Sequence, residues 1–230
     1  FNEGELHAAL KSWYAGRDGQ LEVPVDGYIV DVVRDDLLIE IQTQGFSSIK
    51  RKLHELSEAH AVLLVFPIAR EKWLVKGPKP DAPNRGTTRR KSPKRGTLLE
   101  LFDELVSFPR LLSRPNFQLE VAFTQEEELR SYDPRRGWRR HGWVVDGRRL
   151  LDVVACRRFS GPEDLASELP ENLPARFTTA DLAGAIGRSR RVAQKMAYCF
   201  REMGLIEDVG RRKRSILYAR ASDPDLLARG

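Results

Sequence analysis

The strongest constraint on the fold is the alternating pattern of residues 27–42, Gly-Tyr-Ile-Val-Asp-Val-Val-Arg-Asp-Asp-Leu-Leu-Ile-Glu-Ile-Gln. Two runs rich in β-branched residues flank Asp35-Asp36, which predicts a β-hairpin with a two-residue turn. In that register Asp31 lies opposite Glu40, and both share one face with Gln42. The other face is apolar and is predicted to join the core. It carries Tyr28, Val30, Val32, Ile39 and Ile41.

Two carboxylates directly opposite each other on a hairpin repel unless a cation lies between them. Hard divalent cations bind oxygen ligands of this kind. The hairpin therefore raises the hypothesis of a metal site at Asp31 and Glu40. The alternative, that both residues simply lie on a solvated face, stays open because antiparallel hairpins commonly have one polar face.

The segments around the hairpin predict the order helix, strand, strand, helix, strand over residues 1–70. Residues 2–11 open the first helix, residues 47–61 form the second, and residues 62–66 form a buried strand. This order resembles the PD-(D/E)xK nuclease superfamily, whose core places an acidic residue on the helix, Asp on one strand and Glu-x-Lys on the next. The resemblance implies an α/β fold with a restriction-endonuclease-like central mixed sheet flanked by helices.

The resemblance also implies a Mg²⁺- or Mn²⁺-dependent phosphodiester hydrolase. In such an enzyme Asp31 and Glu40 bind the metal, the backbone of Ile41 completes the coordination, and Glu3 assists. Gln42 departs from the family, which usually has lysine there, although some restriction endonucleases of the superfamily use glutamine. Lys50, early in the next helix, is the candidate replacement. The expected catalytic residues are Glu3, Asp31, Glu40, Gln42 and Lys50.

The first helix carries Glu3, Leu6, Leu10 and Trp13 at helical spacing, so these residues are predicted to share the face that meets the sheet. An acidic side chain on an apolar face needs a partner or a metal. A first-turn interaction of Glu3 with the helix dipole explains it equally well. For Lys50 and its basic neighbours, a solvated helix face is the alternative.

Charge is unevenly distributed: residues 1–75 carry a net −4, residues 76–97 a net +7 and residues 175–220 a net +7. Segregation of this kind indicates a polyanionic partner.

Residues 76–97, rich in Pro and Gly, are predicted to form a flexible basic loop. Residues 135–143 mix arginines with Trp138 and Trp143, which suits phosphate contact and base stacking; a hairpin whose tryptophans pack on the core is the alternative. Asp146-Gly147 is predicted to be a hairpin turn.

Residues 175–222 are predicted to form a separate domain, after a nuclease-like domain of residues 1–160 and a linker of residues 161–174. Thr178 to Asp181 predicts a capped helix start, Gly187-Arg188-Ser189 a turn, and Gly204 the end of a second helix. Two strands with a basic tip follow. This order resembles a winged helix-turn-helix domain, which implies DNA binding; a protein-interaction module is the alternative. The expected DNA-binding residues are Arg188, Ser189, Arg190, Arg191, Gln194, Lys195, Arg211, Arg212, Lys213 and Arg214.

Taken together, the sequence predicts a metal-dependent DNA nuclease whose winged helix holds the substrate. Two rivals stay open: a catalytically inactive nuclease fold that binds DNA, favoured by Gln42, and a transcription regulator. A homodimer would supply the two sites that cleavage of both strands requires. Cys156 and Cys199 have no zinc or redox spacing, are expected to be buried, and fit the cytoplasm. No apolar run of 18 residues occurs, so no membrane span is expected.

Overall fold

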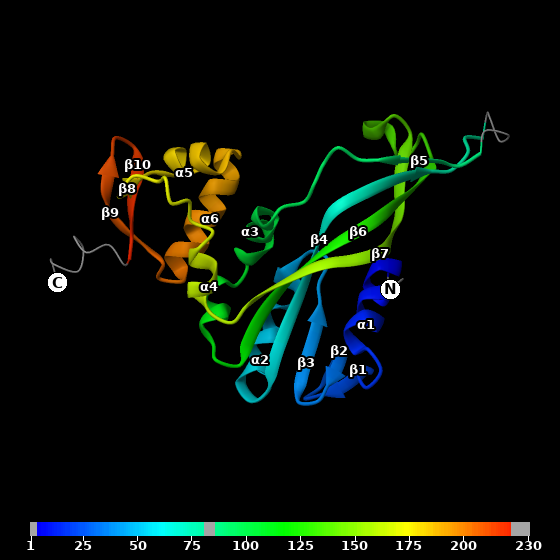
Figure 1. Ribbon diagram of the computed structural model, residues 1–230, viewed down its shortest axis with the longest axis horizontal. Helices are drawn as coiled ribbons and strands as arrows, with labels where there is room; N and C mark the ends of the chain where they lie inside the picture. The colour runs from blue at the N-terminus through cyan, green and yellow to red at the C-terminus, as the bar shows by residue number, and fades with distance from the viewer. Residues whose placement is uncertain (1–3, 81–85, 222–230) are drawn as a thin grey trace. The chain divides into compact units, whose positions relative to one another are not determined.

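The computed structural model describes residues 4–80 and 86–221 (Figure 1). The fold is mixed α/β: a seven-stranded mixed sheet in the order β1-β2-β3-β4-β6-β7, with β5 paired to β4, is accompanied by helices. A small C-terminal sheet has the order β8-β10-β9 and is antiparallel. The predicted fold class, a mixed sheet with helices and a small C-terminal α/β part, is confirmed.

Strands and helices are interspersed along the described chain, as in other α/β proteins. The strands of the larger sheet are β1 (Gln20–Val25), β2 (Tyr28–Arg34), β3 (Leu37–Ile41), β4 (Ala61–Lys76), β5 (Thr88–Lys91), β6 (Phe117–Tyr132) and β7 (Trp143–Phe159). The helices up to β7 are α1 (Glu5–Ala15), η1 (Phe46–Ile49), α2 (Lys50–Ala59), η2 (Leu98–Glu100), α3 (Leu101–Leu105), η3 (Pro109–Ser113) and η4 (Trp138–Arg140). The C-terminal elements are α4 (Pro162–Ala166), β8 (Arg176–Phe177), α5 (Thr179–Ile186), α6 (Arg190–Glu202), β9 (Ile206–Arg212) and β10 (Ser215–Arg220).

The chain forms two compact units, each assembled from three segments of the sequence. The first unit contains residues 1–43, 64–97 and 120–157, and the second contains residues 44–63, 98–119 and 158–230. The boundaries predicted at residues 160 and 175 stay predictions. Within the predicted linker, residues 162–166 form α4.

The predicted hairpin of the first unit is present in the predicted register. Arg34 pairs with Leu37 and Val32 with Ile39, so Asp35-Asp36 forms the turn. Four of the five residues on the predicted core face are buried, and Tyr28 is half-buried. Sequence reasoning missed β1, which pairs with β2 through a two-residue turn at Asp26-Gly27. Both turn residues have positive φ, +47° and +81°, as a type I′ turn requires.

Helix α1 packs against β1, β2 and β3, which lie beside it in Figure 1. Leu6 and Leu10 are buried as predicted, but Trp13 is 49% exposed, so its predicted place facing the sheet is wrong. The buried face is rotated toward Tyr14, whose hydroxyl donates a 2.5 Å hydrogen bond to Glu120 of β6. Burial of this pair raises the pKa of Tyr14 far above its usual range.

Three expectations about the middle of the chain are wrong in part. The strand predicted over residues 62–66 is much longer, since β4 continues to Lys76, and β5 lies inside the predicted flexible loop of residues 76–97. Asp146-Gly147 is not a turn, because β7 runs through it and Ser131 of β6 donates a 2.8 Å hydrogen bond to the Asp146 carboxylate. The chain reverses at residues 133–142 instead, between β6 and β7.

The helix start and end that local sequence patterns predict in the second unit are present in the structure. Thr178 and Asp181 form a reciprocal capping box at the start of α5, and Gly187, with φ +61°, ends that helix. Phe102 of α3 meets Phe200 of α6 edge-to-face, with ring centroids 5.3 Å apart. Cys199 is buried as predicted, and burial raises the pKa of its thiol to about 12.

Cys156, by contrast, is exposed, so its predicted burial is wrong. It lies on β7, which is the last strand in the order of the larger sheet and carries mostly exposed or half-buried side chains. In the described part of the chain, every helix is too short or too polar to cross a membrane.

Candidate functional site

The two carboxylates of the β2–β3 hairpin meet through reciprocal contacts with the opposite strand. The backbone N–H of Ile41 donates to Asp31 Oδ2 at 2.9 Å, and the backbone N–H of Asp31 lies 3.3 Å from Glu40 Oε1. Glu40 is buried, and Asp31 is half-buried. These hydrogen bonds fix the orientation of both carboxylates on the hairpin.

His7 of α1 joins this pair and was not singled out by the sequence. Its Nε2 atom lies 3.2 Å from Asp31 Oδ2 and 2.8 Å from the carbonyl oxygen of Ile41. A carbonyl oxygen only accepts hydrogen bonds, so Nε2 carries the proton in this arrangement. His7 therefore contacts two of the atoms that the resemblance assigns to a metal, the Asp31 carboxylate and the Ile41 carbonyl.

The other three expected catalytic residues are Glu3, Gln42 and Lys50. Glu3 lies outside the described residues. Gln42 is half-buried, and its backbone N–H donates to the carbonyl of Val65 on β4 at 2.9 Å. Lys50 is exposed at the start of α2 and belongs to the second unit, so its approach to Asp31 stays a prediction.

A further basic residue of α1 was missed. Lys11 follows His7 by one helical turn and is 5% exposed, with Nζ 2.8 Å from Glu22 Oε1. A buried lysine is uncommon unless it is paired. The four-residue spacing of His7 and Lys11 predicts that they share one face of the helix. Helix packing is needed to show that this face of α1 is directed toward the hairpin.

The donor chemistry of this cluster suits a small divalent cation. Carboxylate and carbonyl oxygens bind Mg²⁺ and Mn²⁺. Among the described residues, no group of three or more His, Cys, Asp or Glu side chains is spaced to hold a metal. Mg²⁺ is commonly bound through only one or two carboxylates and keeps several waters, so Asp31, Glu40 and the Ile41 carbonyl fit it.

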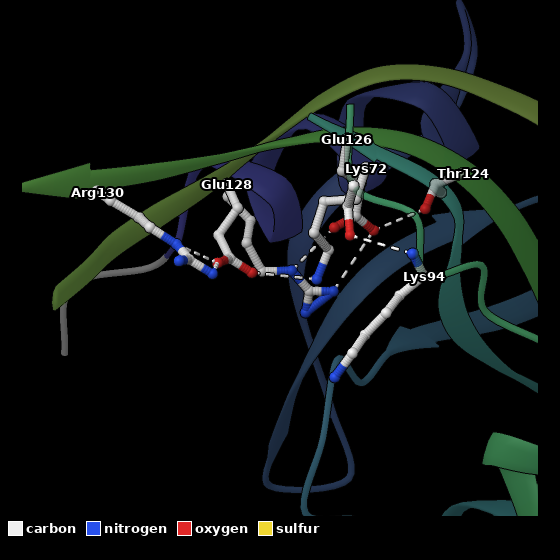
Figure 2. Close-up of polar contacts among 8 residues, drawn as sticks. Lys72, Lys94, Thr124, Glu126, Glu128 and Arg130 are labelled. Carbon is white, nitrogen blue, oxygen red and sulfur yellow. Dashed lines mark hydrogen bonds and ion pairs between the residues drawn. The ribbon is translucent and has the colours of Figure 1, made fainter. Parts of the chain in front are cut away.

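A second group of buried carboxylates lies on β6, where Glu126, Glu127 and Glu128 are each at most 9% exposed. Figure 2 shows Lys72 and Arg130 pointing toward Glu128, and Thr124 pointing toward Glu126. Lys72 Nζ lies 3.1 Å from Glu128 Oε2. The net effect of these cations is to hold the pKa of Glu128 below its usual range, although burial alone would raise it.

The other two glutamates of this group are paired in the same way. Arg148 Nε donates to Glu126 Oε2 at 2.9 Å, and Arg89 and Arg149 bond to Glu127 at 2.6 Å and 3.3 Å. Every glutamate of the group thus has an arginine or lysine of its own chain as partner. This arrangement holds β4, β5, β6 and β7 together and is structural.

The expected DNA-binding residues lie on α6 and at the tip of the β9–β10 hairpin. Arg190, Arg191 and Gln194 are exposed in the first turns of α6, and residues 211–214 are exposed at the tip. Ser189 occupies the N-cap position of α6 without a capping hydrogen bond from its side chain. Arg188 is exposed in the turn before it. These positions form a basic surface on the second unit.

Several of these residues also have intramolecular partners, and Arg190 donates a 3.3 Å hydrogen bond to Ser215 Oγ. Lys195 is half-buried and its Nζ lies 2.8 Å from Asp103 Oδ1 of α3. Arg212 pairs with the Asp181 carboxylate of α5. Hydrogen bonds from Thr178, and then the charge of Arg212, keep the pKa of Asp181 below its usual range.

A groove of about 380 Å³ lies between α6 and β10. Three of its lining residues are arginines, Arg190, Arg201 and Arg214, and Gln194 and Tyr198 line it as well. Arginine guanidinium groups bind phosphate oxygens in bidentate fashion. The groove therefore has the chemistry to hold a phosphate backbone.

Comparisons with known proteins identify a family but no activity. A family described as "Domain of unknown function (DUF8091)" matches residues 4–160. An uncharacterized protein of Treponema pallidum (strain Nichols) is 33% identical over 184 residues, which cover 79% of this chain and 71% of that protein. No solved structure matches the chain.

Proposed function

The chain belongs to the DUF8091 family, and we propose that it is a metal-dependent nuclease that hydrolyses phosphodiester bonds in DNA. The nuclease site is formed by Asp31, Glu40 and the carbonyl of Ile41, with His7 beside them. DNA is held by α6 and the β9–β10 hairpin, which act as a winged helix. The order of elements over residues 1–70, similar to that of PD-(D/E)xK nucleases, supports this assignment.

The observation that carries the proposal is the convergence of three acceptor groups on one hairpin. Asp31 Oδ2 accepts from the N–H of Ile41, whose carbonyl oxygen lies 2.8 Å from His7 Nε2. Glu40 is held on the next strand by the N–H of Asp31. A bound Mg²⁺ or Mn²⁺ would lower the pKa of a coordinated water and neutralise the scissile phosphate.

The protein side chains have separate roles in this proposal. Asp31 and Glu40 hold the cation, and His7 fixes the orientation of the Asp31 carboxylate from the helix side. Gln42 orients the water or the phosphate, since an amide donates and accepts hydrogen bonds but carries no charge. Glu3 and Lys50 remain candidate contributors, the first to the metal and the second to the developing negative charge.

The winged-helix part of the proposal rests on charge and shape. The N-terminal residues of α6 and the basic tip of the β9–β10 hairpin are exposed, and the arginine-lined groove lies between α6 and β10. In winged helices the second helix reads the major groove and the hairpin contacts the backbone. The expected consequence is DNA affinity that falls steeply with salt.

The decisive experiment is a cleavage assay with Mg²⁺ or Mn²⁺ on supercoiled, linear, single-stranded and branched DNA. Wild type is compared with Asp31→Asn and Glu40→Gln, which keep side-chain size and remove charge. Asp36→Asn is the matched control, because Asp36 is an exposed acid in the turn of the same hairpin. We expect metal-dependent cleavage that falls at least about a hundredfold in the first two variants and persists in the third.

A second candidate function is a DNA-binding protein on an inactive nuclease fold. Two observations favour it: Gln42 stands where the superfamily usually has lysine, and the described residues hold no group of three metal-binding side chains. Salt-dependent DNA binding without cleavage, equal in wild type and Asp31→Asn, would establish this alternative. If Arg191→Ala loses DNA binding but still cleaves short substrates, DNA binding and cleavage belong to different parts of the protein.

A further inference from the structure

We propose that the turn between β6 and β7, residues 133–142, binds an unpaired nucleobase by stacking it on Trp138, with Arg135, Arg136 and Arg139 on the adjoining phosphates. This surface uses none of the residues assigned to the nuclease site or to α6 and the β9–β10 hairpin. The proposed role concerns which class of nucleic acid is bound, and it does not depend on whether the hairpin carboxylates are catalytic.

The turn has a defined conformation because Asp133 closes it. The Asp133 N–H donates to the carbonyl of Gly142 at 2.8 Å, and the Asp133 carbonyl accepts from the N–H of Gly137 at 2.8 Å. Its carboxylate accepts the backbone N–H groups of Arg135 and Arg136 at 3.0 Å and 3.2 Å. These bonds hold the backbone of the turn in place, and the arginine side chains take no part in them.

The two tryptophans of this region have different environments. Trp143 meets Tyr132 edge-to-face at a centroid distance of 5.5 Å, and Lys76 Nζ lies 4.4 Å from its ring centroid. Trp138 is 70% exposed, with the guanidinium of Arg139 4.8 Å from its ring centroid. Trp143 is therefore part of the packed strands, whereas the large apolar ring of Trp138 is presented to solvent beside a cation.

The charges on the turn differ from those on the neighbouring strands. Arg148, Arg149 and Arg89 are paired with buried glutamates of β6. Arg135, Arg136 and Arg139 are exposed, and no ion pair joins them to another residue that the structure describes. Asp133 is the acidic group of the turn, and its carboxylate is engaged by backbone N–H groups. The three arginines are positioned to meet an anion from outside.

An exposed indole flanked by arginines matches a nucleobase and its phosphates. Every base has a π-face that stacks on an aromatic ring without sequence preference, and arginine adds a cation–π and phosphate contact. In a duplex the faces of internal bases are covered by their neighbours, so a stacking site of this kind selects a single strand, a frayed end or a flipped base. The occupant is therefore an unpaired nucleotide segment.

The test measures binding by fluorescence anisotropy in EDTA, where cleavage cannot contribute. The probes are a dT oligonucleotide and an abasic oligonucleotide of the same length, which has the phosphates without the bases. Trp138→Ala is compared with Trp13→Ala, the matched control, because Trp13 is also an exposed tryptophan of the first unit. Both comparisons are repeated in an Arg191→Ala, Arg214→Ala background, so that the winged-helix surface does not mask the turn.

We expect Trp138→Ala to weaken dT binding about tenfold, to leave abasic binding unchanged, and Trp13→Ala to match wild type on both. Arg135→Ala with Arg136→Ala should reduce the slope of log Kd against log salt by about 0.7 for each phosphate that the variant no longer neutralises. Unchanged dT binding by Trp138→Ala in both backgrounds would overturn the proposal. An equal decrease in affinity for both oligonucleotides would also overturn it and indicate a surface for anionic partners in general.

Discussion

Two groups of carboxylates in the first unit, buried or half-buried, are stabilised in different ways. Glu126, Glu127 and Glu128 on β6 each meet a lysine or arginine. Asp31 and Glu40 on the β2–β3 hairpin are held by backbone N–H groups, and Asp31 also contacts His7. A lysine or arginine beside a carboxylate neutralises its charge, whereas backbone N–H groups fix its orientation.

The β6 arrangement is structural, and we propose a binding role for the hairpin carboxylates. The β6 glutamates link neighbouring strands through fixed ion pairs and have no need of an external partner. In the proposed function, the hairpin carboxylates instead hold a divalent cation that exchanges with water. The proposed function rests on this distinction, and three measurements test it.

The largest effect is expected from Glu126→Ala, measured by urea unfolding at neutral pH. The Glu126 side chain is fully buried and bonds to Arg148 and Thr124, so its removal leaves their polar groups without a partner. The free energy of unfolding should fall by about 3 kcal/mol. Glu5→Ala is the control, since the exposed pair of Glu5 with Arg149 is worth less than about 1 kcal/mol. Equal losses in both variants would contradict a structural role for the β6 group.

The next largest effect is stabilisation by Mn²⁺ itself. At a free concentration about a hundred times Kd, a metal that binds only the folded state raises the free energy of unfolding by about 2.7 kcal/mol. We expect this increment in wild type and in Glu127→Gln, and we expect Asp31→Asn and Glu40→Gln to lose it. Thermal unfolding scans over a Mn²⁺ titration measure it. An undiminished increment in Asp31→Asn would place the metal elsewhere.

The smallest effect is a change in the pH dependence of stability. Burial alone would raise the pKa of Glu128, but the hydrogen bonds and charges of Arg130 and Lys72 outweigh it and lower that pKa. A carboxyl with a lowered folded-state pKa stabilises the protein above its unfolded pKa, and this contribution is lost as the pH falls through the folded value. Glu128→Gln lacks that contribution, so it should lose less stability than wild type between about pH 5 and pH 3.

Urea midpoints at a series of pH values measure this difference, with Glu5→Gln as a control for the loss of one acidic side chain. If wild type and Glu128→Gln lose stability in parallel, the cations around Glu128 do not stabilise its charged form.

Local patterns in the sequence were sufficient for several elements. The alternation of residues 28–41 predicted both the hairpin and its register, because side chains alternate between two faces and only one register buries the apolar set. Thr178 and Asp181 predicted the start of α5, because a capping box is formed within one helical turn. Asp31 and Glu40 were brought together by the same reasoning.

Two of the three Asp-Gly pairs in the sequence show where local patterns fail. Asp26-Gly27 forms a type I′ turn that was overlooked, whereas Asp146-Gly147 was predicted to be a turn and lies inside β7. The same dipeptide adopts either conformation because the outcome depends on the strand beside it. For Asp146, that neighbour is Ser131 of β6, which bonds to its carboxylate.

Residue order alone was enough to specify the β2–β3 hairpin with its register, the helices before and after it, and the basic character of the C-terminal helix and hairpin; it missed β1. Packing was needed to show that His7 meets Asp31, that Tyr14 rather than Trp13 is buried, and that Trp138 is exposed while Trp143 packs. The cause is range: alternation and capping act within a few residues, whereas contacts between α1 and the hairpin join groups 24 to 34 positions apart. Such contacts depend on how the helix is rotated against the sheet, which is set by the packing of the whole core.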